Sequence, residues 1–470
     1  LRPQPRTGVI MSLKTVSNMI YQGDIADLPP MTAPMPRGGV YYADLVNSLF
    51  VSKPDSNFSK NRNYATALSF TRTTLASFIS AAGNLEYAAI NTPRIDRHPA
   101  TRKILGMRVE NSATNYALSA LDQTAANYVP SGLTVSAPAA GWCTLTESTM
   151  NEAHVLMDNQ STIDPTLYNV VSLFAKAGSA QYLQIQVLGA GAQAFANFDV
   201  RNQKVTKMGR LAVRANIFQG FNDSARCVLC VKGSGNTVGS VKYSLINDPL
   251  AEPDVAYVGT GRTMQVSLMQ IEKNSYHASS AFFPDGAVGG TASANRQADA
   301  ARLLDIPAGV KSNFSVFVKG IMTPAALGNA GGNILFSLLN NTALKYVGFG
   351  LGAADSSNAF QSLAAHNINA GSTLAGIPFT GKLFSQYGEY ALMITLNNGV
   401  LKVYSGMTDS PETLLTGCPA FDYVMLGRNS SVSGSTVSNS GFWGGWLQKA
   451  VLFDSALSDA DMIAQFDLLS

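Results

Sequence analysis

The feature that most constrains the fold of this chain is a strand-period alternation of apolar and polar residues. Within 183–187, leucine, isoleucine and valine alternate with two glutamines, and within 347–351 valine, phenylalanine and leucine alternate with two glycines. Such alternation predicts β-strands with one face in a core. Asn398-Gly399 separates two further apolar runs and is typical of a hairpin, because both turn positions need a positive φ. We therefore expect an all-β fold of antiparallel β-sandwiches.

The composition indicates a folded chain of several domains that carries little charge. Its 470 residues suggest two to four domains. Hydrophobic residues make up 46% and charged residues 13%, against about 25% charged in an average protein. The apolar content is ample for cores, which excludes a disordered chain. Low charge suits a protein that hides surface in an assembly, and the net charge of +3 is too small to indicate nucleic-acid binding.

Changes of texture along the chain suggest its division. Six prolines fall within the first 36 residues, which is typical of an extended arm that lies on a partner, with a flexible leader as the alternative. We predict an arm over 1–63, a small β-rich attachment region over 64–130, a first jelly-roll sandwich over 131–290, a linker over 291–311 and a second sandwich over 312–470.

A short internal repeat supports two sandwiches. The segment 172–178 is echoed by 315–320, and each half closes with a strand-like run, 264–271 in the first and 446–453 in the second. A chance match is the alternative for so short a repeat. Two sandwiches of about 150 residues each would explain it.

Helices are expected at two places. Ser458 can cap a helix, with Asp461 three residues on and three apolar residues on one face, Met462, Ile463 and Phe466. A second helix is predicted over 293–304. Both would be short beside the predicted strands.

The four cysteines indicate buried thiols. Cys227 and Cys230 form a C-x-x-C inside an apolar run, where strand alternation would turn the two thiols to opposite faces. A zinc site would need a second such pair or nearby histidines. We predict no metal site and no cofactor.

Catalytic patterns were sought among the carboxylates, histidines and serines. Polysaccharide cleavage needs a carboxylate pair flanking the bond, and Glu147 with Glu152 lacks a recognisable catalytic context. The four histidines are scattered, and no G-x-S-x-G turn is present. We therefore predict no catalytic residues and a protein that is not an enzyme.

Two tryptophans are the candidate ligand contacts. Aromatic rings stack on the C–H faces of sugars, and Trp443 and Trp446 flank a Gly-Gly pair in the predicted second sandwich. Alternation would place them on opposite faces, so one of them would be exposed. Core packing is the alternative reading of both side chains.

The segment 60–108 is basic. Basic strands can face nucleic acid or acidic sugars, or they can pair with acidic neighbours in an assembled particle. We favour pairing with neighbours, since stacking aromatics are not interleaved with the basic residues. These residues are Lys60, Arg62, Arg72, Arg94, Arg97, Arg102, Lys103 and Arg108.

Residues 70–118 resemble a segment that recurs in bacteriophage tail and fibre proteins. The similarity rests on Phe70, Thr71, Arg72, Thr74, Gly83, Ala88, Ala89, Pro93, Arg94, Asp96, Leu105, Gly106, Glu110, Thr114 and Asn115. Thr71 stands where the family has a small residue. In that family a jelly-roll sandwich follows, which 172–187 and 268–276 resemble, and Arg296 with Asp299 is similar to its outgoing linker.

Residues 312–470 resemble a laminin-G or concanavalin-A-like sandwich, as such phage proteins carry. The similarity rests on 426–428, 444–447 and 457–460. Together the two resemblances imply a virion protein, most simply a tail-fibre or baseplate component that aids adsorption to host-surface glycan. A capsid-decorating or head-fibre protein and a polysaccharide depolymerase are the alternatives, and a cellular lectin would be expected to carry an export signal.

The resemblance also implies partners. Other virion proteins are expected to bind the N-terminal arm, host surface polysaccharide is a second expected partner, and a homotrimer is the expected assembly. No membrane contact is expected, because no run of 18 apolar residues occurs, and no nucleic acid is expected. The predicted location is the virion.

Overall fold

The structure of the protein is a computed structural model, and the residues that it describes lie within the unit Met35–Ser470. Strands dominate them, so the predicted all-β fold is confirmed. The described residues are 36, 38–47, 49–55, 57–62, 68–235, 240–275, 278–282, 294–303, 313–322, 333–340, 345–351, 362–367, 372–378, 388–406, 411–415, 423–426, 429–433, 436–440 and 445–470.

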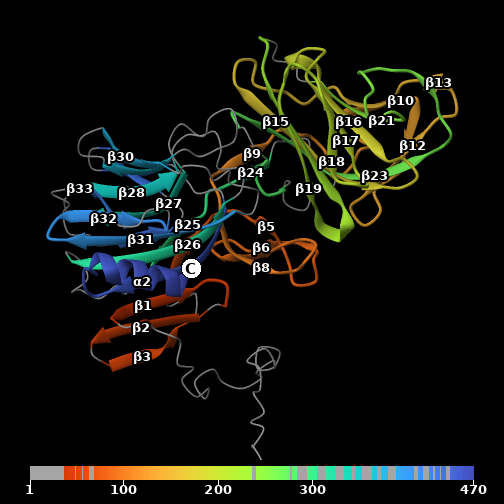
Figure 1. The fold of residues 1–470 in the computed structure, drawn as a ribbon. Coiled ribbons are helices and arrows are strands. Elements are labelled where there is room, and N and C mark those ends of the chain that lie inside the picture. Colours follow the sequence, from red (N-terminus) through yellow and green to blue (C-terminus); the bar gives the residue numbers. More distant parts are fainter. Residues whose placement is uncertain are drawn as a thin grey trace, which may run out of the picture. The chain divides into compact units, whose positions relative to one another are not determined.

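Two six-stranded antiparallel sheets form the first sandwich (Figure 1). The β16 sheet has the order β10 (Tyr128–Ser131), β14 (His154–Asp158), β21 (Val241–Ile246), β16 (Tyr182–Val187), β17 (Phe195–Asp199), β18 (Lys204–Met208). The β15 sheet has the order β11 (Leu133–Val135), β12 (Cys143–Glu147), β23 (Thr263–Lys273), β15 (Tyr168–Ala177), β20 (Ala225–Lys232), β19 (Ala212–Gln219).

The core of this sandwich lies between the two sheets. Leu183, Ile185 and Val187 are fully buried in one cluster with side chains of the β15 sheet, as the alternation predicts. Gln184 is buried as well, because its side-chain amide bonds Asn197 at 2.8 Å under the 249–251 segment. Both faces of β16 are therefore covered, where the sequence predicts one.

The two cysteines of β20 occupy opposite faces of their sheet. Cys227 belongs to the core between the sheets, and Cys230 packs with Val170 and Val228 on the outer face. Both thiols are free and buried, as predicted. Burial raises the pKa of Cys230 to about 12, so this thiol is unreactive at neutral pH.

Two larger sheets form the second sandwich. The β26 sheet has the order β3 (Asn57–Arg62), β2 (Leu49–Asp55), β1 (Gly39–Asp44), β37 (Gly445–Phe453), β26 (Phe314–Met322), β31 (Gly388–Asn397), β32 (Val400–Tyr404), β33 (Glu412–Leu415). The β27 sheet has the order β30 (Ser372–Pro378), β29 (Ser362–Asn367), β28 (Lys345–Leu351), β27 (Asn333–Asn340), β34 (Tyr423–Leu426), β25 (Ala300–Leu303), β4 (Leu68–Thr71).

The N-terminal strands belong to this second sandwich. β1 pairs with β37, placing Tyr42 opposite Val451, and β2 and β3 extend the same sheet, as the red and orange strands of Figure 1 show. The six residues of β1 are all buried. The segments 39–44, 49–55 and 57–62, expected as part of an extended arm, are thus strands of this sheet. Residues 1–35 lie outside the described ones.

The helix predicted over 293–304 is wrong. Residues 294–296 form β24, which pairs with β9 (Ala113–Asn115), and 300–303 form β25. β25 lies between β4 and β34, so sheet hydrogen bonds on both sides override the local helical pattern.

The internal repeat corresponds to equivalent strands. Segment 172–178 overlaps β15 and 315–320 lies in β26; β15 pairs antiparallel with β23, and β26 with β37. Both pairs contain a register shift, between Ser172 and Phe174 in the first and between Lys319 and Gly320 in the second. The repeat therefore marks a strand pair that occurs once in each sandwich.

The other local predictions for the second sandwich are confirmed. Asn398 and Gly399, with φ of 48° and 77°, join β31 to β32. α2 (Asp459–Leu469) follows Ser458, whose hydroxyl accepts from the Asp461 backbone N–H. Its buried residues are Met462, Phe466 and Leu469, and the Phe466 ring packs edge-on against Tyr404 with 5.0 Å between centroids.

Short strands between the two sandwiches in sequence complete the fold. β5 (Ala76–Ile79) pairs with β6 (Leu85–Ala88), and β7 (Arg94–Arg97) pairs with β8 (Ile104–Val109), which in turn pairs with β37. Two further strand pairs are β13 (Asn151–Glu152) with β22 (Tyr257–Val258) and β35 (Asn429–Ser433) with β36 (Thr436–Ser440).

Candidate functional site

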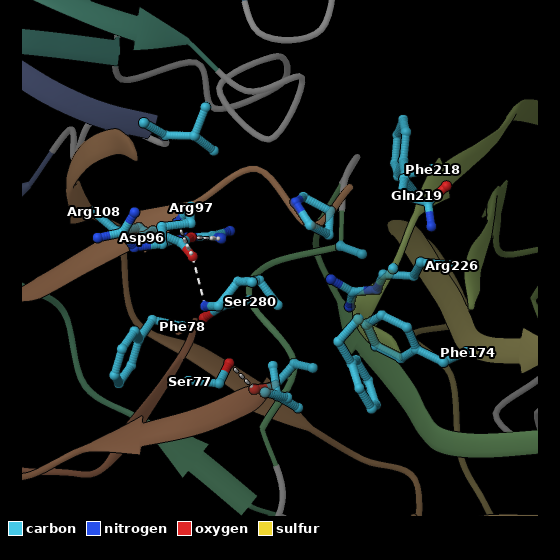
Figure 2. Close-up of a pocket in the computed structure, with 18 of the residues that line it drawn as sticks. Ser77, Phe78, Asp96, Arg97, Arg108, Phe174, Phe218, Gln219, Arg226 and Ser280 are labelled. Carbon is cyan, nitrogen blue, oxygen red and sulfur yellow. Dashed lines mark hydrogen bonds and ion pairs between the residues drawn. The ribbon is translucent and has the colours of Figure 1, made fainter. Parts of the chain in front are cut away.

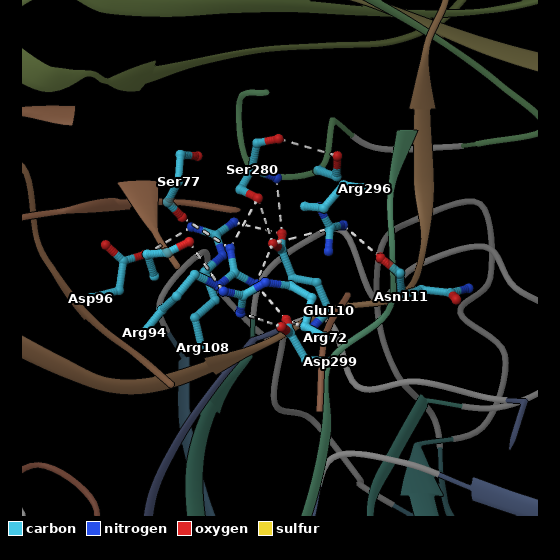
Figure 3. A network of polar contacts seen from close by, with 12 residues as sticks. Arg72, Ser77, Arg94, Asp96, Arg108, Glu110, Asn111, Ser280, Arg296 and Asp299 are labelled. Atoms are coloured by element: carbon cyan, nitrogen blue, oxygen red, sulfur yellow. Dashed lines mark hydrogen bonds and ion pairs between the residues drawn. The ribbon is translucent and has the colours of Figure 1, made fainter. Parts of the chain in front are cut away.

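A buried ionic network lies where the segment 72–110 meets the segment 280–299 (Figure 3). At its centre, Asp299 Oδ1 accepts from Arg72 Nη1 at 2.9 Å, and Asp299 Oδ2 accepts from Arg94 Nη2 and from the Glu110 backbone N–H. These side chains are at most 4% exposed. A buried charge is costly unless it is paired, so the seven members depend on one another. They are Arg72, Arg94, Asp96, Arg108, Glu110, Arg296 and Asp299.

Glu110 is the second acceptor of this network. Its carboxylate pairs with Arg94 at 3.1 Å and Arg108 at 2.8 Å, and it accepts from the backbone N–H and hydroxyl of Ser280. Burial alone would favour the neutral acid, but Arg108, Arg296 and Arg94 hold the pKa of Glu110 well below its usual range. The carboxylate therefore stays ionised and fixes the 280 segment in place.

Segment 70–118 supplies five of the seven network members. Arg72 also donates to the backbone carbonyl oxygens of Thr74 and Ala89. Asn115 donates to the carbonyls of Met269 and Phe282. Gly106 has a φ of 130°, and a Cβ there would lie 2.4 Å from the Leu447 carbonyl oxygen of β37. The motif residues are thus the ones that join β4–β9 to the rest of the chain.

The basic segment pairs with acids of its own chain. Arg72, Arg94 and Arg108 all bind carboxylates of Asp96, Glu110 or Asp299. Pairing with acidic neighbours in a particle was the expectation for these residues. For these three arginines the structure corrects it, since distant acids such as Asp299 are brought to them by the fold.

A cavity of about 120 Å³ lies beside this network (Figure 2). One wall is the outer face of the β15 sheet, and the other is formed by β5, β7 and β8 with Trp446. Its residues include Ser77, Phe78, Ile79, Asp96, Arg97, Leu105, Arg108, Phe174, Asn216, Phe218, Gln219, Phe221, Arg226, Val228, Ser280 and Trp446.

Three side chains form a row across the β15-sheet wall. Arg226 of β20 stands opposite Phe174 of β15 and Phe218 of β19 in the strand registers, so strand pleating turns all three to one face. The Arg226 guanidinium carbon lies 5.3 Å from the centre of the Phe174 ring. Asn216 adds an amide on the same side of β19. The wall thus combines aromatic faces with hydrogen-bond donors.

Arg226 is held by neutral groups. Its Nη1 donates to the Ser279 carbonyl at 2.6 Å and its Nη2 to the Ser172 hydroxyl at 3.0 Å. Among the described residues no acceptor bonds its buried Nε, and no carboxylate lies within ion-pair distance. Burial lowers the pKa of Arg226 to about 10, so the guanidinium stays charged at neutral pH.

The opposite wall is fixed by Asp96. Its carboxylate accepts from the backbone N–H groups of Ile79 and Arg97, from Arg108 Nη1 at 2.8 Å and from Trp446 Nε1 at 2.9 Å. Such a saturated carboxylate is a positioning group. In Figure 2 Asp96, Arg97 and Arg108 stand across the cavity from Arg226 and Phe218.

The structure describes one of the two candidate tryptophans, Trp446. Trp446 lines the cavity but is only 4% exposed, and the Arg108 guanidinium covers its ring at 5.1 Å. Trp443 lies outside the described residues. Glycan contact by either side chain stays a prediction.

Other polar candidates have structural partners. Glu147 pairs with Arg262 at 2.8 Å, and Glu152 accepts from Ser148. His154 packs edge-on against Tyr257, with ring centres 4.4 Å apart. His277 and the side chain of His366 lie outside the part of the chain that the structure describes.

Sequence reasoning missed the row Phe174, Arg226 and Phe218. Arg226 interrupts an apolar strand run, 225–231, and a lone arginine in such a run was the available signal. The pairing of β20 with β15, a strand about 50 residues earlier in the chain, was not readable, because register depends on the whole sheet.

The described residues contain neither a metal-binding cluster nor a membrane-spanning helix. No group of three or more histidine, cysteine or acidic side chains is arranged to hold a metal ion there. Nor do those residues include a helix with the length and apolar character to cross a membrane.

Comparisons with known proteins give matches of low identity and low TM-score. No family model and no curated protein matches the chain. Domain 4 of a GH43 arabinanase from Geobacillus stearothermophilus is 16% identical, covering 36% of this chain and 73% of that one at a TM-score of 0.23. The CBM40 of a Ruminococcus gnavus sialidase is 15% identical (34% and 84% covered, TM-score 0.25), and mouse laminin α1 domains LG4-5 are 11% identical (79% and 96%, 0.24). Likenesses at this level assign no ligand or activity to the chain.

Proposed function

We propose that this chain is a structural protein of a bacteriophage particle, a tail-fibre or baseplate component, that adheres to host-surface glycan through the cavity beside the β15 sheet. The observation that carries the glycan site is the row of Phe174, Arg226 and Phe218 facing that cavity. Aromatic faces stack on sugar C–H groups, while guanidinium and amide groups bond hydroxyls and carboxylates. Few polar groups on an apolar wall are typical of a small-ligand site.

The virion role is supported by the phage-like segment of the sequence. Several of its residues, among them Arg72, Arg94 and Glu110, belong to the ionic network that lies beside the cavity. The segment and the proposed site are therefore parts of one structural unit. We propose a homotrimer as the assembly and the virion as the location.

A binding role is favoured over a hydrolytic one. Glycosidases need a free acid and a second carboxylate, whereas the cavity carboxylate of Asp96 already accepts four hydrogen bonds. We therefore propose that the chain is not an enzyme.

A glycan array probed with the purified chain tests the adhesion proposal. Wild-type protein should bind a subset of bacterial surface glycans, and Phe218→Ala should weaken that binding because a stacking face is worth about 1 kcal/mol. Phe282→Ala, a buried aromatic outside the cavity lining, is the matched control. Absence of any glycan binding by folded wild-type protein would contradict the proposal.

Immunogold labelling of phage particles with antibody to residues 312–470 tests the location. Gold at the tail tip agrees with an adsorption role. Gold over the head would replace it with capsid decoration, and light scattering of the purified chain would measure the proposed trimer.

A further inference from the structure

The charge around the cavity is unbalanced. The network and the cavity walls together contain six arginines, Arg72, Arg94, Arg97, Arg108, Arg226 and Arg296. The carboxylates beside them are four, Asp96, Glu110, Asp299 and Glu272. Arg97 and Arg226 are the two arginines of this group with no ion pair among the described residues, and both are half-buried, so an anion that enters the cavity can reach them.

The carboxylates are already used by other groups. Asp299 is held by Arg72 and Arg94, and Glu110 by Arg94, Arg108 and Ser280. Glu272 accepts from the Ser279 backbone N–H at 2.9 Å, and burial raises the pKa of this carboxyl.

Arg226 is the cation best placed to receive an anion. Its two Nη groups donate to neutral oxygens of Ser172 and Ser279, and its Nε is buried with no acceptor among the described residues. Five N–H groups in a planar fork match a carboxylate or phosphate. The half-buried Phe218 ring, opposite Arg226 on β19, would pack against the sugar ring that carries such an anion. The Phe174 ring is 5% exposed and lies under the Arg226 guanidinium.

Arg97 supplies a second positive group from the opposite wall. Its Nη1 donates to the Arg102 carbonyl at 3.1 Å, an acceptor without net charge. The Asp96 carboxylate next to it is saturated by Ile79, Arg108 and Trp446. The cavity thus places cations on both sides of the space between its walls.

We infer that the cavity selects an anionic saccharide, with its acidic group on Arg226 and its ring against Phe218. This inference rests on the glycan adhesion proposed above. Uronic acids and phosphate-bearing sugars share the required chemistry. A neutral sugar would leave the arginine excess uncompensated.

Titration calorimetry with matched saccharides tests the inference on the full chain. The probes are trigalacturonic acid, its fully methyl-esterified form, and a glycerol-phosphate-bearing trisaccharide. The first two share one backbone and differ only in charge. Wild-type protein should bind an acidic probe about tenfold or more tighter than the ester, because hydrogen bonds to charged groups are worth about 1.5–3 kcal/mol. The two acidic probes distinguish carboxylate from phosphate recognition.

Variants assign the effect to the residue. Arg226→Gln should lose about tenfold or more in affinity for the acidic probe and little for the ester. Arg226→Lys, which keeps the charge but not the fork, should fall between. Arg210→Gln is the matched control, since it removes the same charge from an exposed side chain of the first sandwich.

The outcomes separate the two proposals. Equal binding of acid and ester would overturn the anionic selection and leave glycan adhesion standing. Binding of no saccharide would remove both. If Arg226→Gln fails to fold, the salt dependence of wild-type binding decides, since affinity for the acid should fall with salt while affinity for the ester should not. A flat salt dependence for the acid would contradict the inference.

Discussion

The two sandwiches differ in where they obtain their strands. The first takes all twelve from one continuous stretch, 128–273. The second takes β1–β4, β7 and β8 from the N-terminal side of the first and the others from its C-terminal side, so that Tyr42 pairs with Val451. The first sandwich is therefore an insertion between parts of the second. Closing the second requires contacts that span most of the chain.

The central strands of the sandwiches agree while the outer ones differ. Neighbours β23, β15 and β20 correspond to β37, β26 and β31 in sheet order. The next strand outward is β19, beside β20, in the first sandwich and β32, beside β31, in the second. In sequence β19 precedes its neighbour, whereas β32 follows its neighbour. The three central strands are the part that the two sandwiches share, and the strands outside them come from different segments of the chain. This explains why the repeat is visible only over the central strands.

Removing Asp299 is expected to have the largest effect, because it acts where both sandwiches meet the 72–110 segment. Asp299→Ala leaves Arg72 and Arg94 buried without their shared carboxylate. Breaking a buried pair costs about 3–5 kcal/mol. Chemical denaturation should show both sandwiches destabilised.

The matched control for Asp299 is Asp254, a half-exposed partner of Lys242 in the first sandwich. Asp254→Ala should cost about 0–1 kcal/mol, as exposed pairs do. An equal loss of unfolding free energy from both substitutions would show that the buried network contributes no more to stability than an exposed ion pair does.

The discontinuity of the second sandwich can be tested with two phenylalanines. Phe50 of β2 and Phe198 of β17 are both fully buried, one in each sandwich. Each change to alanine should cost about 3–5 kcal/mol. Phe50→Ala should lower the melting transition of the second sandwich and Phe198→Ala that of the first, measured by calorimetry.

The comparison sharpens if the transitions separate in this way. Loss of the first transition in Phe50→Ala would mean that β2 stabilises the molecule as a whole. In that case the N-terminal strands and the inserted sandwich would form one cooperative unit.

Acid should weaken the first sandwich through Glu147. Burial alone would raise the pKa of Glu147, but hydrogen bonds from Arg262, Thr260 and Tyr257 lower it to about 2. With an unfolded pKa of about 4.3, its contribution is present above that pH and is lost as pH falls toward 2.

Glu147→Gln gives the measurement for this group. It should cost about 1–3 kcal/mol in the first sandwich at pH 7, since a charged hydrogen-bond acceptor is lost. The difference from wild type should shrink between pH of about 4.3 and 2 in thermal denaturation. A difference that stays constant with pH would contradict the role of the ionised carboxylate.

Local features of the sequence predicted much of the fold. The 183–187 alternation, the Asn398-Gly399 hairpin and the cap at Ser458 all depend on neighbours in the chain. The 293–304 helix failed because β25 is held by partners more than 100 residues away. Strand assignment of 39–44 was missed for the same reason, since its pairing partner is β37.

The candidate site was less predictable than the fold. Arg72, Arg94 and Asp299 were visible as motif residues, but not their mutual pairing, because it joins positions about 200 residues apart. Trp446 was singled out as a sugar platform, yet its ring is covered by Arg108. Side-chain position across strands follows from sheet register, which no single segment encodes.

The smallest expected effect concerns the helix that closes the second sandwich. Ser458 caps α2 through the Asp461 backbone N–H, and Ser458→Ala should cost about 1 kcal/mol. Ser458→Asp keeps a capping oxygen and should remain within a few tenths of a kcal/mol of wild type. Because Phe466 of α2 packs on Phe317 of β26, the loss should appear only in the transition of the second sandwich. A shift in the first transition would show that α2 stabilises both sandwiches, which would weaken the contrast between an inserted, self-contained sandwich and a discontinuous one.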